Sequence, residues 1–251
     1  MLDDAPLYMV QLALETPGLF EAARQRRLPV RDIDTGYLVH CRLVDLFGDE
    51  APKPFVVEGS QGRLLRVLGY GRNDAPTLTE AARRYASPDA FSSCRWPIST
   101  KAMPEAWPPG HQLGFEVRFC PVVRVSSDNS RQGAGAEVDV FLRACSEHER
   151  REAEGKMDRE AVYRDWLARE LARGGAATPL TGEMVNFRLA RLLRRTQGMD
   201  RASALTTRPD VTIRGTLRID DGPAFSELLA RGIGRHRSFG FGMLRLVPPG
   251  R

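Results

Sequence analysis

Short apolar segments recur along the chain, and their spacing predicts the elements of its first half. Residues 7–14 partly alternate between apolar and polar side chains, which predicts a β-strand. Residues 37–47 carry apolar side chains at helical spacing, and they are followed by Gly48, a residue type that commonly ends helices. Two apolar runs, 55–58 and 64–68, flank a Gly-Ser-Gln-Gly turn and predict a hairpin.

The second half predicts further strands and helices after a proline-rich stretch. Residues 71–110 contain six prolines, so we predict a linker there, with a short helix at 78–85 and a strand near 96–99. Residues 185–195 are apolar and basic, and they fit either a helix or a strand. Further strands are expected over 114–124, 138–142, 211–219 and 240–247. Further helices are expected over 157–173, where Asp158 is the predicted N-cap, and over 223–229.

Each half therefore shows a strand, a helix and further strands in the same order. This order predicts an α+β fold of two tandem ferredoxin-like (RRM-like) βαββαβ domains. We place the N-terminal domain over residues 1–105 and the C-terminal domain over residues 106–251. No internal sequence repeat is visible, so the expectation rests on the order of the elements alone.

Composition is typical of a folded protein and narrows its chemistry. Of 251 residues, 42% are hydrophobic and 27% are charged, which is enough for a packed core. No apolar stretch reaches the about 18 residues of a membrane helix, and the acidic start at residues 1–4 is unlike a signal peptide. We therefore expect a cytoplasmic protein that does not bind membranes. Because the four cysteines and four histidines lack metal-site spacing, we expect no metal and no cofactor.

Positive charge is concentrated near the C-terminus. The net charge is only +5, yet residues 186–218 and 231–245 hold twelve arginines against two aspartates. The remainder of the chain is net acidic. A basic zone of this kind indicates binding to a polyanion.

A glycine-rich segment within this zone, residues 232–242, is the first candidate site. Its glycines allow a close backbone approach to phosphate, and its arginines offer paired hydrogen bonds. The alternative is a tight turn packed on a sheet. The segment is neither a Walker loop nor a dinucleotide fingerprint, since it lacks Gly-Lys-Ser/Thr and leads into a strand. The candidate RNA-binding residues are Gly232, Gly234, Arg235, His236, Arg237, Ser238, Gly240 and Gly242.

Other residues of the zone could also bind nucleic acid. The arginine run consists of Arg188, Arg191, Arg194 and Arg195. In a helix, three of these arginines share one face, whereas in a strand they scatter over both faces. Either form could follow RNA phosphates, and the alternative is a solvated surface. Phe239 and Phe241 could stack on bases or belong to the core.

Tyr37 and His40 are the candidate catalytic pair. They are three residues apart at the start of the predicted helix, so they share a face. Histidine exchanges protons near neutral pH, and a phenol can donate to a phosphate oxygen. On spacing alone, a structural role for this histidine is the more common one.

Several segments together resemble one protein family. Residues 225–247 resemble the glycine-rich signature of the CRISPR-associated RAMP endoribonucleases, most of all the CasE (Cse3) branch. Residues 36–40 match the Y-x-x-H helix start of that branch, residues 115–124 resemble the strand that opens its second domain, and residues 163–168 resemble its W-L helix. The resemblance runs, with gaps, from about residue 7 to residue 247.

The resemblance implies two ferredoxin-like domains and a role in maturing CRISPR RNA. Branch members cut a repeat RNA at the base of a stem-loop without metal, through attack of the 2′-hydroxyl on the adjacent phosphate. The products carry a cyclic 2′,3′-phosphate and a 5′-hydroxyl. The implied partners are the repeat RNA or crRNA stem-loop and other subunits of a CRISPR effector complex.

The resemblance also assigns roles to residues. His40 is implied as the general acid or base, with Tyr37 as its partner near the scissile phosphate. The four glycines carry over as the glycine-rich loop, with Arg235 and Arg237 near the RNA backbone. Arg237 or Arg235 replaces the usual lysine of the loop, and His236 adds a second candidate acid.

One segment departs from the family pattern. Residues 143–201 are arginine-rich and longer than a compact member needs, so we expect a basic helical insertion that grips the RNA stem. Such an insertion would be typical of a subtype variant such as the type IV systems, with the arginines carrying more of the catalysis.

Three functions stay open from the sequence. The first is a metal-independent endoribonuclease that stays on its crRNA product. The second is a non-catalytic subunit that binds the crRNA hairpin within an effector complex. The third is a ferredoxin-like binder unrelated to RNA.

Overall fold

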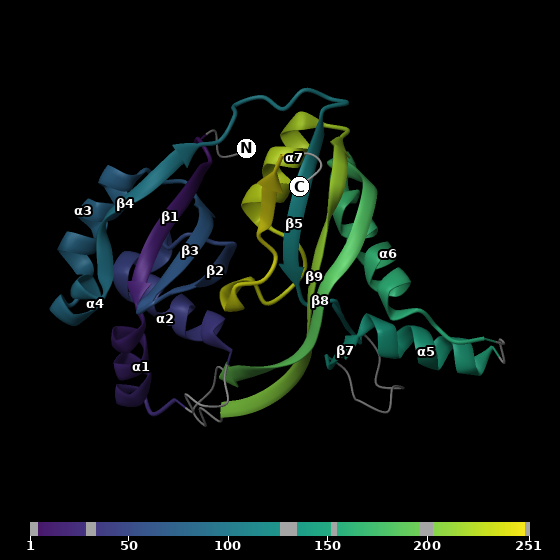
Figure 1. Ribbon diagram of the computed structural model, residues 1–251, viewed down its shortest axis with the longest axis horizontal. Helices are drawn as coiled ribbons and strands as arrows, with labels where there is room; N and C mark the ends of the chain where they lie inside the picture. The colour runs from purple at the N-terminus through teal and green to yellow at the C-terminus, as the bar shows by residue number, and fades with distance from the viewer. Residues whose placement is uncertain (1–4, 29–33, 126–134, 152–154, 196–202, 249–251) are drawn as a thin grey trace.

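The computed structural model of the chain describes residues 5–28, 34–125, 135–151, 155–195 and 203–248. Its main strands form two four-stranded antiparallel sheets, which lie side by side with helices packed on them (Figure 1). A short additional pair joins β6 (Val122–Arg124) to β7 (Glu137–Asp139).

The first sheet has the strand order β2-β3-β1-β4. In chain order its unit contains β1 (Tyr8–Glu15), α1 (Thr16–Gln25), α2 (Thr35–Phe47), β2 (Phe55–Gln61), β3 (Leu64–Gly71), α3 (Ala75–Tyr85), α4 (Pro88–Ser92) and β4 (Cys94–Ala102). β1 alternates because Val10, Leu12 and Leu14 are buried in the core. The strand predicted over 7–14, the helix over 37–47 and the hairpin over 55–68 are confirmed as β1, α2 and the β2–β3 pair, whereas α1 was not predicted.

The start and end of α2 follow from local sequence signals. The Asp34 carboxylate accepts a hydrogen bond from the amide of Gly36 at 2.9 Å and caps the helix. Gly48 ends the helix with φ 58°, a conformation that favours glycine. Leu43 and Leu46 are buried in the first core, so one face of the helix is fixed by packing.

The predicted linker over residues 71–110 is wrong for most of its length. The short helix and the strand predicted within it are confirmed as α3 and β4, and together with α4 they complete the first unit. Pro76 and Pro88 lie in the first turns of their helices and Pro97 lies in an edge strand, all places where proline is tolerated. The two sheets are joined by the segment between Ala102 and Gln112, where the proposed boundary after residue 105 falls.

The second sheet repeats the first, with the order β10-β5-β9-β8. Its unit contains β5 (Gln112–Phe119), α5 (Val140–Arg150), α6 (Arg159–Leu171), β8 (Ala177–Arg195), β9 (Ser203–Ile219), α7 (Gly222–Arg231) and β10 (Leu244–Val247). If the four strands of each unit are numbered one to four along the chain, their order across the sheet is four, one, three, two in both units. The α+β fold of two tandem ferredoxin-like units is therefore confirmed.

Two predicted strands of this unit differ from the structure. Residues 138–142 are mostly helical, because Asp139 accepts a hydrogen bond from the amide of Phe141 at 2.8 Å and caps α5. The final strand begins at Leu244 and not at residue 240, because the two glycines before it have positive φ and cannot continue a strand.

The predicted helical insertion over residues 143–201 is only partly helical. α5 and α6 are helices, but they occupy the first helical position of the ferredoxin-like unit and are not an insertion. The basic segment is strand β8, which pairs with β9 from Ala177 to Arg195. This long hairpin extends past the sheet toward α1 and α2 (Figure 1), where Leu193 is buried with Leu28 and Leu38. Pairing and burial at this end favour the strand over the helix.

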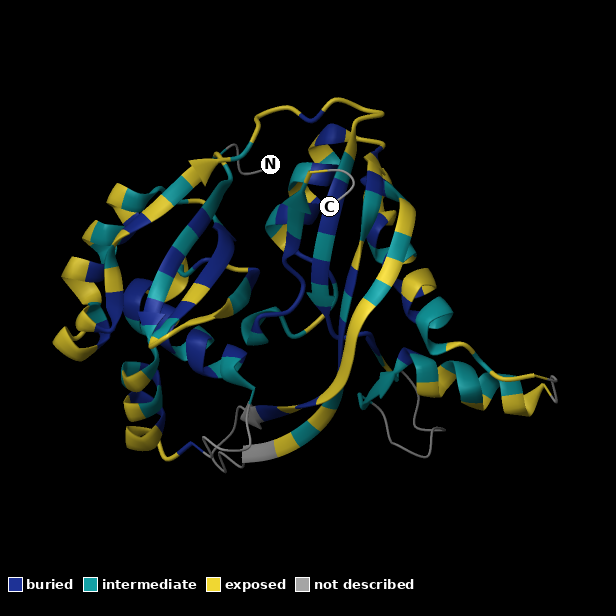
Figure 2. Ribbon diagram, viewed as in Figure 1, coloured by how far each residue is buried: buried dark blue, intermediate teal, exposed yellow. Residues whose placement is uncertain are grey.

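The two units also share a core. Leu68 and Tyr70 of β3 lie in the same buried cluster as Phe115 and Val117 of β5. The Tyr70 hydroxyl donates to the carbonyl oxygen of Leu244 at 2.9 Å, and burial raises the pKa of this phenol. Buried residues lie along the central strands β1, β3, β5 and β9, whereas edge strand β8 is mostly exposed (Figure 2). This shared packing holds the sheets in a fixed arrangement.

Candidate functional site

The glycine-rich segment 232–242 is a loop between α7 and β10. Its four glycines all have positive φ. A Cβ on Gly242 would overlap the carbonyl oxygen of Ile233, and a Cβ on Gly234 would lie 2.7 Å from the ring of Trp166. Backbone conformation and close packing therefore require glycine at these positions.

Several amides of this loop are already used within the protein. Those of Gly232, Gly240 and Gly242 donate to carbonyl oxygens at 2.8, 3.4 and 2.7 Å. They are unavailable to a phosphate while these bonds hold. The structure thus supports the packing explanation for the glycines, and the cationic side chains of the loop are the stronger candidates for contacts with a polyanion.

The first turn of α2 lies directly against this loop, at η3 (Arg237–Phe239). A Cβ on Gly36 would overlap the carbonyl oxygen of Phe239, so the two backbones touch. The ring of Tyr37 stacks on that of Phe239 with centroids 5.3 Å apart, and the ring of His40 lies 6.5 Å from that of Tyr37. Two segments that the sequence singled out separately are therefore neighbours in space.

His40 is half-buried on α2. Burial lowers the pKa of its imidazole below the ordinary value of 6.5, and the charge of Lys53 lowers it further. The ring is therefore mostly neutral at pH 7. A neutral imidazole can accept a proton, so the environment favours a base over an acid at this position.

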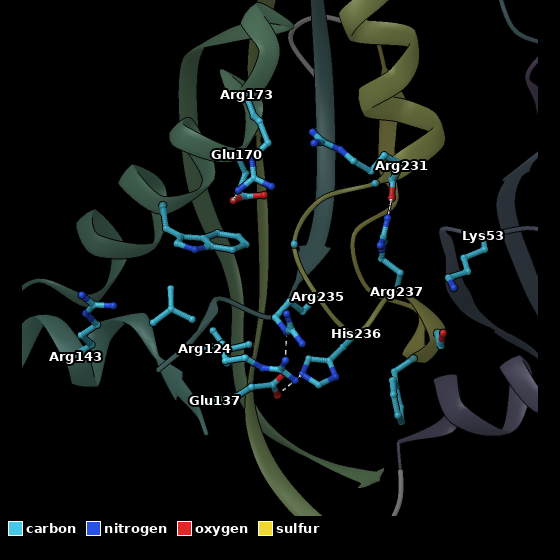
Figure 3. Close-up of a pocket in the computed structure, with 17 residues that line it drawn as sticks. Lys53, Arg124, Glu137, Arg143, Glu170, Arg173, Arg231, Arg235, His236 and Arg237 are labelled. Atoms are coloured by element: carbon cyan, nitrogen blue, oxygen red, sulfur yellow. Dashed lines mark hydrogen bonds and ion pairs between the residues drawn. The ribbon is translucent and has the colours of Figure 1, made fainter. Parts of the chain in front are cut away.

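A cavity of about 740 Å³ opens beside the loop (Figure 3). Its charged lining residues are Lys53, Arg124, Glu137, Arg143, Glu170, Arg173, Arg231, Arg235 and Arg237. The seven cations against two carboxylates produce a strongly positive surface, which attracts polyanions. His236, Ser238, Gly232 and Gly234 also line the cavity. His40 does not line it, but Lys53 links the two because it lines the cavity and acts on the imidazole.

Glu137 holds the basic part of the loop in place. Its side chain is only 5% exposed; the carboxylate accepts a hydrogen bond from Arg235 at 2.7 Å and lies 2.9 Å from Nε2 of His236 (Figure 3). It also pairs with Arg208 at 3.4 Å. The contact with His236 holds the pKa of Glu137 well below its usual range. Arg235 lowers this pKa further, whereas burial acts in the opposite direction. Arg235 and Arg208 share the single carboxylate of Glu137, so this cluster has a net positive charge that can attract an anionic ligand.

The sequence did not reveal a buried ion-pair network where α2 begins. Arg118 of β5 donates to Asp210 of β9 and to Asp34, in both cases at 2.8 Å. Arg188 of β8 donates to the same two carboxylates, at 2.6 and 3.1 Å. In the sequence, Asp34 stands shortly before the predicted helix over 37–47. Nothing in the sequence connected it to residues on distant strands.

The arginine run lies on strand β8, so its members do not share a helical face. The Arg188 side chain is 57% exposed, but its guanidinium is bound to two carboxylates. Arg191 is exposed, and its carbonyl oxygen accepts from the amide of Asp34 at 3.1 Å. The side chains of Arg194 and Arg195 lie outside the described part of the structure.

The two phenylalanines of the loop have different environments. Phe241 is fully buried beneath the guanidinium of Arg118, 4.2 Å from its ring centroid, so it cannot stack on a base. Phe239 is half-buried against Tyr37.

In the described ranges, no three His, Cys, Asp or Glu side chains group closely enough to hold a metal ion. None of the described helices has the length and apolar character needed to cross a membrane.

The fold and site define a class: α+β proteins of two ferredoxin-like units with a basic cavity beside a glycine-rich loop. Comparison with known families is consistent with this class. The family of CRISPR-associated proteins matches residues 7–248. The chain therefore belongs to the CRISPR-associated protein family. No curated protein sequence matches it significantly.

Solved structures share the fold over almost the whole chain. Thermus thermophilus Cse3, bound to an RNA representing a pre-cleavage complex, has a TM-score of 0.62 and 18% identity, covering 97% of this chain and 100% of its own. Escherichia coli K-12 Cas6e has a TM-score of 0.56 and 21% identity, covering 96% and 99%. A chain of a CRISPR RNA-guided surveillance complex has a TM-score of 0.58 and 14% identity, covering 96% and 99%.

Proposed function

We propose that the protein is a metal-independent endoribonuclease that cuts CRISPR repeat RNA at a stem-loop and stays bound to the mature crRNA. One observation carries the proposal: Tyr37 stacks on Phe239, which brings the helix of His40 to the basic loop. The fold shared with RNA-bound Cse3 supports it. The implied partners are the repeat RNA stem-loop and other subunits of an effector complex.

The proposed reaction needs a base, a proton donor and cationic support. Neutral His40 takes the proton of a ribose 2′-hydroxyl, and the 2′-oxygen then attacks the adjacent phosphorus. The bond from phosphorus to the 5′-oxygen breaks, and that oxygen receives a proton. The products are a 2′,3′-cyclic phosphate and a 5′-hydroxyl. Tyr37 donates to a phosphate oxygen, and His236 beside Glu137 is the candidate donor to the leaving oxygen.

The cations of the cavity would bind the RNA backbone. Arg235 and Arg237 present guanidinium groups from the loop, and Lys53 presents its ammonium from the first unit (Figure 3). Guanidinium groups bind phosphate oxygens in pairs and stabilise the charge that develops on them. RNA held between these groups would lie beside the first turn of α2, close to Tyr37.

A second candidate function is a non-catalytic subunit that binds the crRNA hairpin. It is favoured by the position of His40, which lies next to the basic cavity without lining it. The shared fold with a chain of a surveillance complex is compatible with this function. Both candidates use the same basic surface, so binding alone does not separate them.

Product analysis distinguishes the two candidates. A repeat stem-loop RNA is incubated with the protein in EDTA, beside an identical RNA that carries a 2′-deoxy sugar at the cut position. We expect the natural RNA to yield a cyclic 2′,3′-phosphate by mass spectrometry, and the 2′-deoxy RNA to bind equally well but stay intact. Cleavage of the 2′-deoxy RNA would contradict the proposed attack. Tight binding of the natural RNA without cleavage would establish the binding subunit.

A further inference from the structure

The buried network at the start of α2 connects the two halves of the proposed site. We infer that Asp34, Arg118, Asp210 and Arg188 form a positioning tether that holds the His40 helix against the glycine-rich loop. For its effect on cleavage, this inference rests on the proposed function. The tether itself is a property of the fold and can be tested without RNA.

Asp34 uses its two carboxylate oxygens for two different tasks. Oδ1 accepts from the amide of Gly36 at 2.9 Å and caps α2. Oδ2 accepts from Arg118 at 2.8 Å and from Arg188 at 3.1 Å, on strands of the other unit. The backbone amide of Asp34 also donates to the carbonyl oxygen of Arg191 at 3.1 Å. A helix cap needs only the first of these bonds, so the others serve to join the units.

Arg118 contacts the glycine-rich loop as well as α2. Its carbonyl oxygen accepts from the amide of Gly242 at 2.7 Å, and its guanidinium covers the ring of Phe241 at 4.2 Å. The same guanidinium donates to Asp34 and Asp210. One residue therefore fixes the first turn of α2 and the end of the loop relative to each other. His40 lies in the second turn of that helix, so its place depends on this contact.

Three of the four side chains of the tether are largely buried. Those of Asp210, Asp34 and Arg118 are 1%, 7% and 16% exposed, whereas that of Arg188 is 57% exposed. Burial of Arg118 disfavours its charge, but Asp210 and Asp34 outweigh this effect and raise the pKa of the guanidinium. Two carboxylates face two guanidinium groups, so the network is balanced in charge. Removing one carboxylate leaves buried charge without its partner, and the elements must shift to relieve it.

The tether predicts a defect in the rate of cleavage and not in RNA affinity. Arg118 and Asp34 do not line the basic cavity. Arg235, which does line it, is held by Glu137 and not by the tether, so we expect the RNA-binding cations to stay in place when the tether is cut. A purely stabilising network would lower the melting temperature and leave the rate at lower temperature unchanged. A positioning network lowers that rate, because a displacement of about 1 Å of a reacting group can cost 100-fold.

The test compares Asp34→Ser with Asp74→Ser. Serine can still cap a helix, so Asp34→Ser keeps the cap of α2 and removes the ion pairs. Asp74 caps α3 by accepting from the amide of Thr77 at 3.0 Å, and its substitution is the matched control. Single-turnover cleavage at saturating protein, the RNA Kd and amide hydrogen exchange of residues 35–40 are measured for both variants, well below their melting temperatures.

We expect Asp34→Ser to cleave about 10- to 100-fold more slowly at an RNA Kd within about twofold of wild type, and Asp74→Ser to behave as wild type. A wild-type rate in Asp34→Ser, or a loss confined to affinity, would overturn the tether. If Asp34→Ser does not fold, Asp34→Asn, which keeps the cap acceptor without the charge, is judged in the same way.

Hydrogen exchange separates a failure of the tether from a failure of the proposed function. If wild-type protein cuts no RNA, the proposed function fails and exchange alone decides on the tether. We then expect exchange at residues 35–40 to rise about tenfold or more in Asp34→Ser and to be unchanged in Asp74→Ser. Equal exchange in both variants would overturn the inference.

Discussion

At the scale of single residues, the protonation of His40 is set by its surroundings. Burial is the larger cause of its lowered pKa, and the ammonium of Lys53 is the second. Lys53 comes from the segment before β2, not from the helix of His40. The sequence marked His40 as a candidate but gave no sign of Lys53, because their proximity is a product of the fold.

Removing the charge of Lys53 tests this environment. In Lys53→Gln the pKa of His40 should rise toward 6.5 without exceeding it, because burial still disfavours the charged ring. The pKa is read from the imidazole carbon protons by NMR titration of the RNA-free protein. Lys101→Gln, at an exposed position of edge strand β4, is the control and should leave it unchanged. A wild-type pKa at or above 6.5 would contradict the account.

The same shift fixes the direction of two pH effects. The unfolded chain binds a proton at His40 at a higher pH than the folded protein does, so stability falls as the pH drops below 6.5. If neutral His40 is the base, cleavage falls as the pH drops through the lowered pKa. In Lys53→Gln this acid limb should move to higher pH.

At the scale of elements, the contact between α2 and η3 is so close that it leaves no room for a methyl group. A Cβ on Gly36 would overlap the carbonyl oxygen of Phe239, which is backbone and cannot rotate away. Helix propensity alone would favour alanine over glycine here by about 1 kcal/mol. For Gly36→Ala, the close contact therefore predicts a loss of stability, whereas helix propensity predicts a gain.

Gly36→Ala should destabilise the protein by about 1–3 kcal/mol, because α2 and the loop must move apart. Gly71→Ala is the matched control, since a Cβ there would meet its neighbours at 3.7 Å or more, which is ordinary contact. The control should change the free energy of unfolding by less than about 1 kcal/mol. Urea denaturation measures both changes. Stabilisation by Gly36→Ala would show that the helix does not press on the loop.

Elements with local signals were predictable, and elements that depend on distant partners were not. α2 carries its cap in Asp34 and its stop in Gly48, and α6 carries its cap in Asp158. Residues 185–195 carry no such signal, and their strand form depends on pairing with β9 and on burial of Leu193 against the first unit. The prolines in 71–110 suggested a linker, and this prediction was wrong because proline is also tolerated in first helical turns and in edge strands.

At the scale of the whole molecule, the basic cavity combines residues from several parts of the chain. The charge windows of the sequence contained Arg231, Arg235 and Arg237, which line it. They did not contain Lys53, Arg124, Arg143 and Arg173, which the fold brings to the same cavity. The basic zone is therefore visible in the sequence, whereas the contribution of both units to the cavity is a product of the fold.

The central claim is that α2 of the first unit and the basic loop of the second together cut RNA. Its most direct test is the single-turnover cleavage of a repeat stem-loop in EDTA by wild type, His40→Ala and His111→Ala. His111 is an exposed histidine outside the site and serves as the control. The account predicts that His40→Ala binds the RNA with unchanged affinity and cleaves it about 10²- to 10⁴-fold more slowly, while His111→Ala matches wild type. Equal cleavage rates for all three proteins would contradict it.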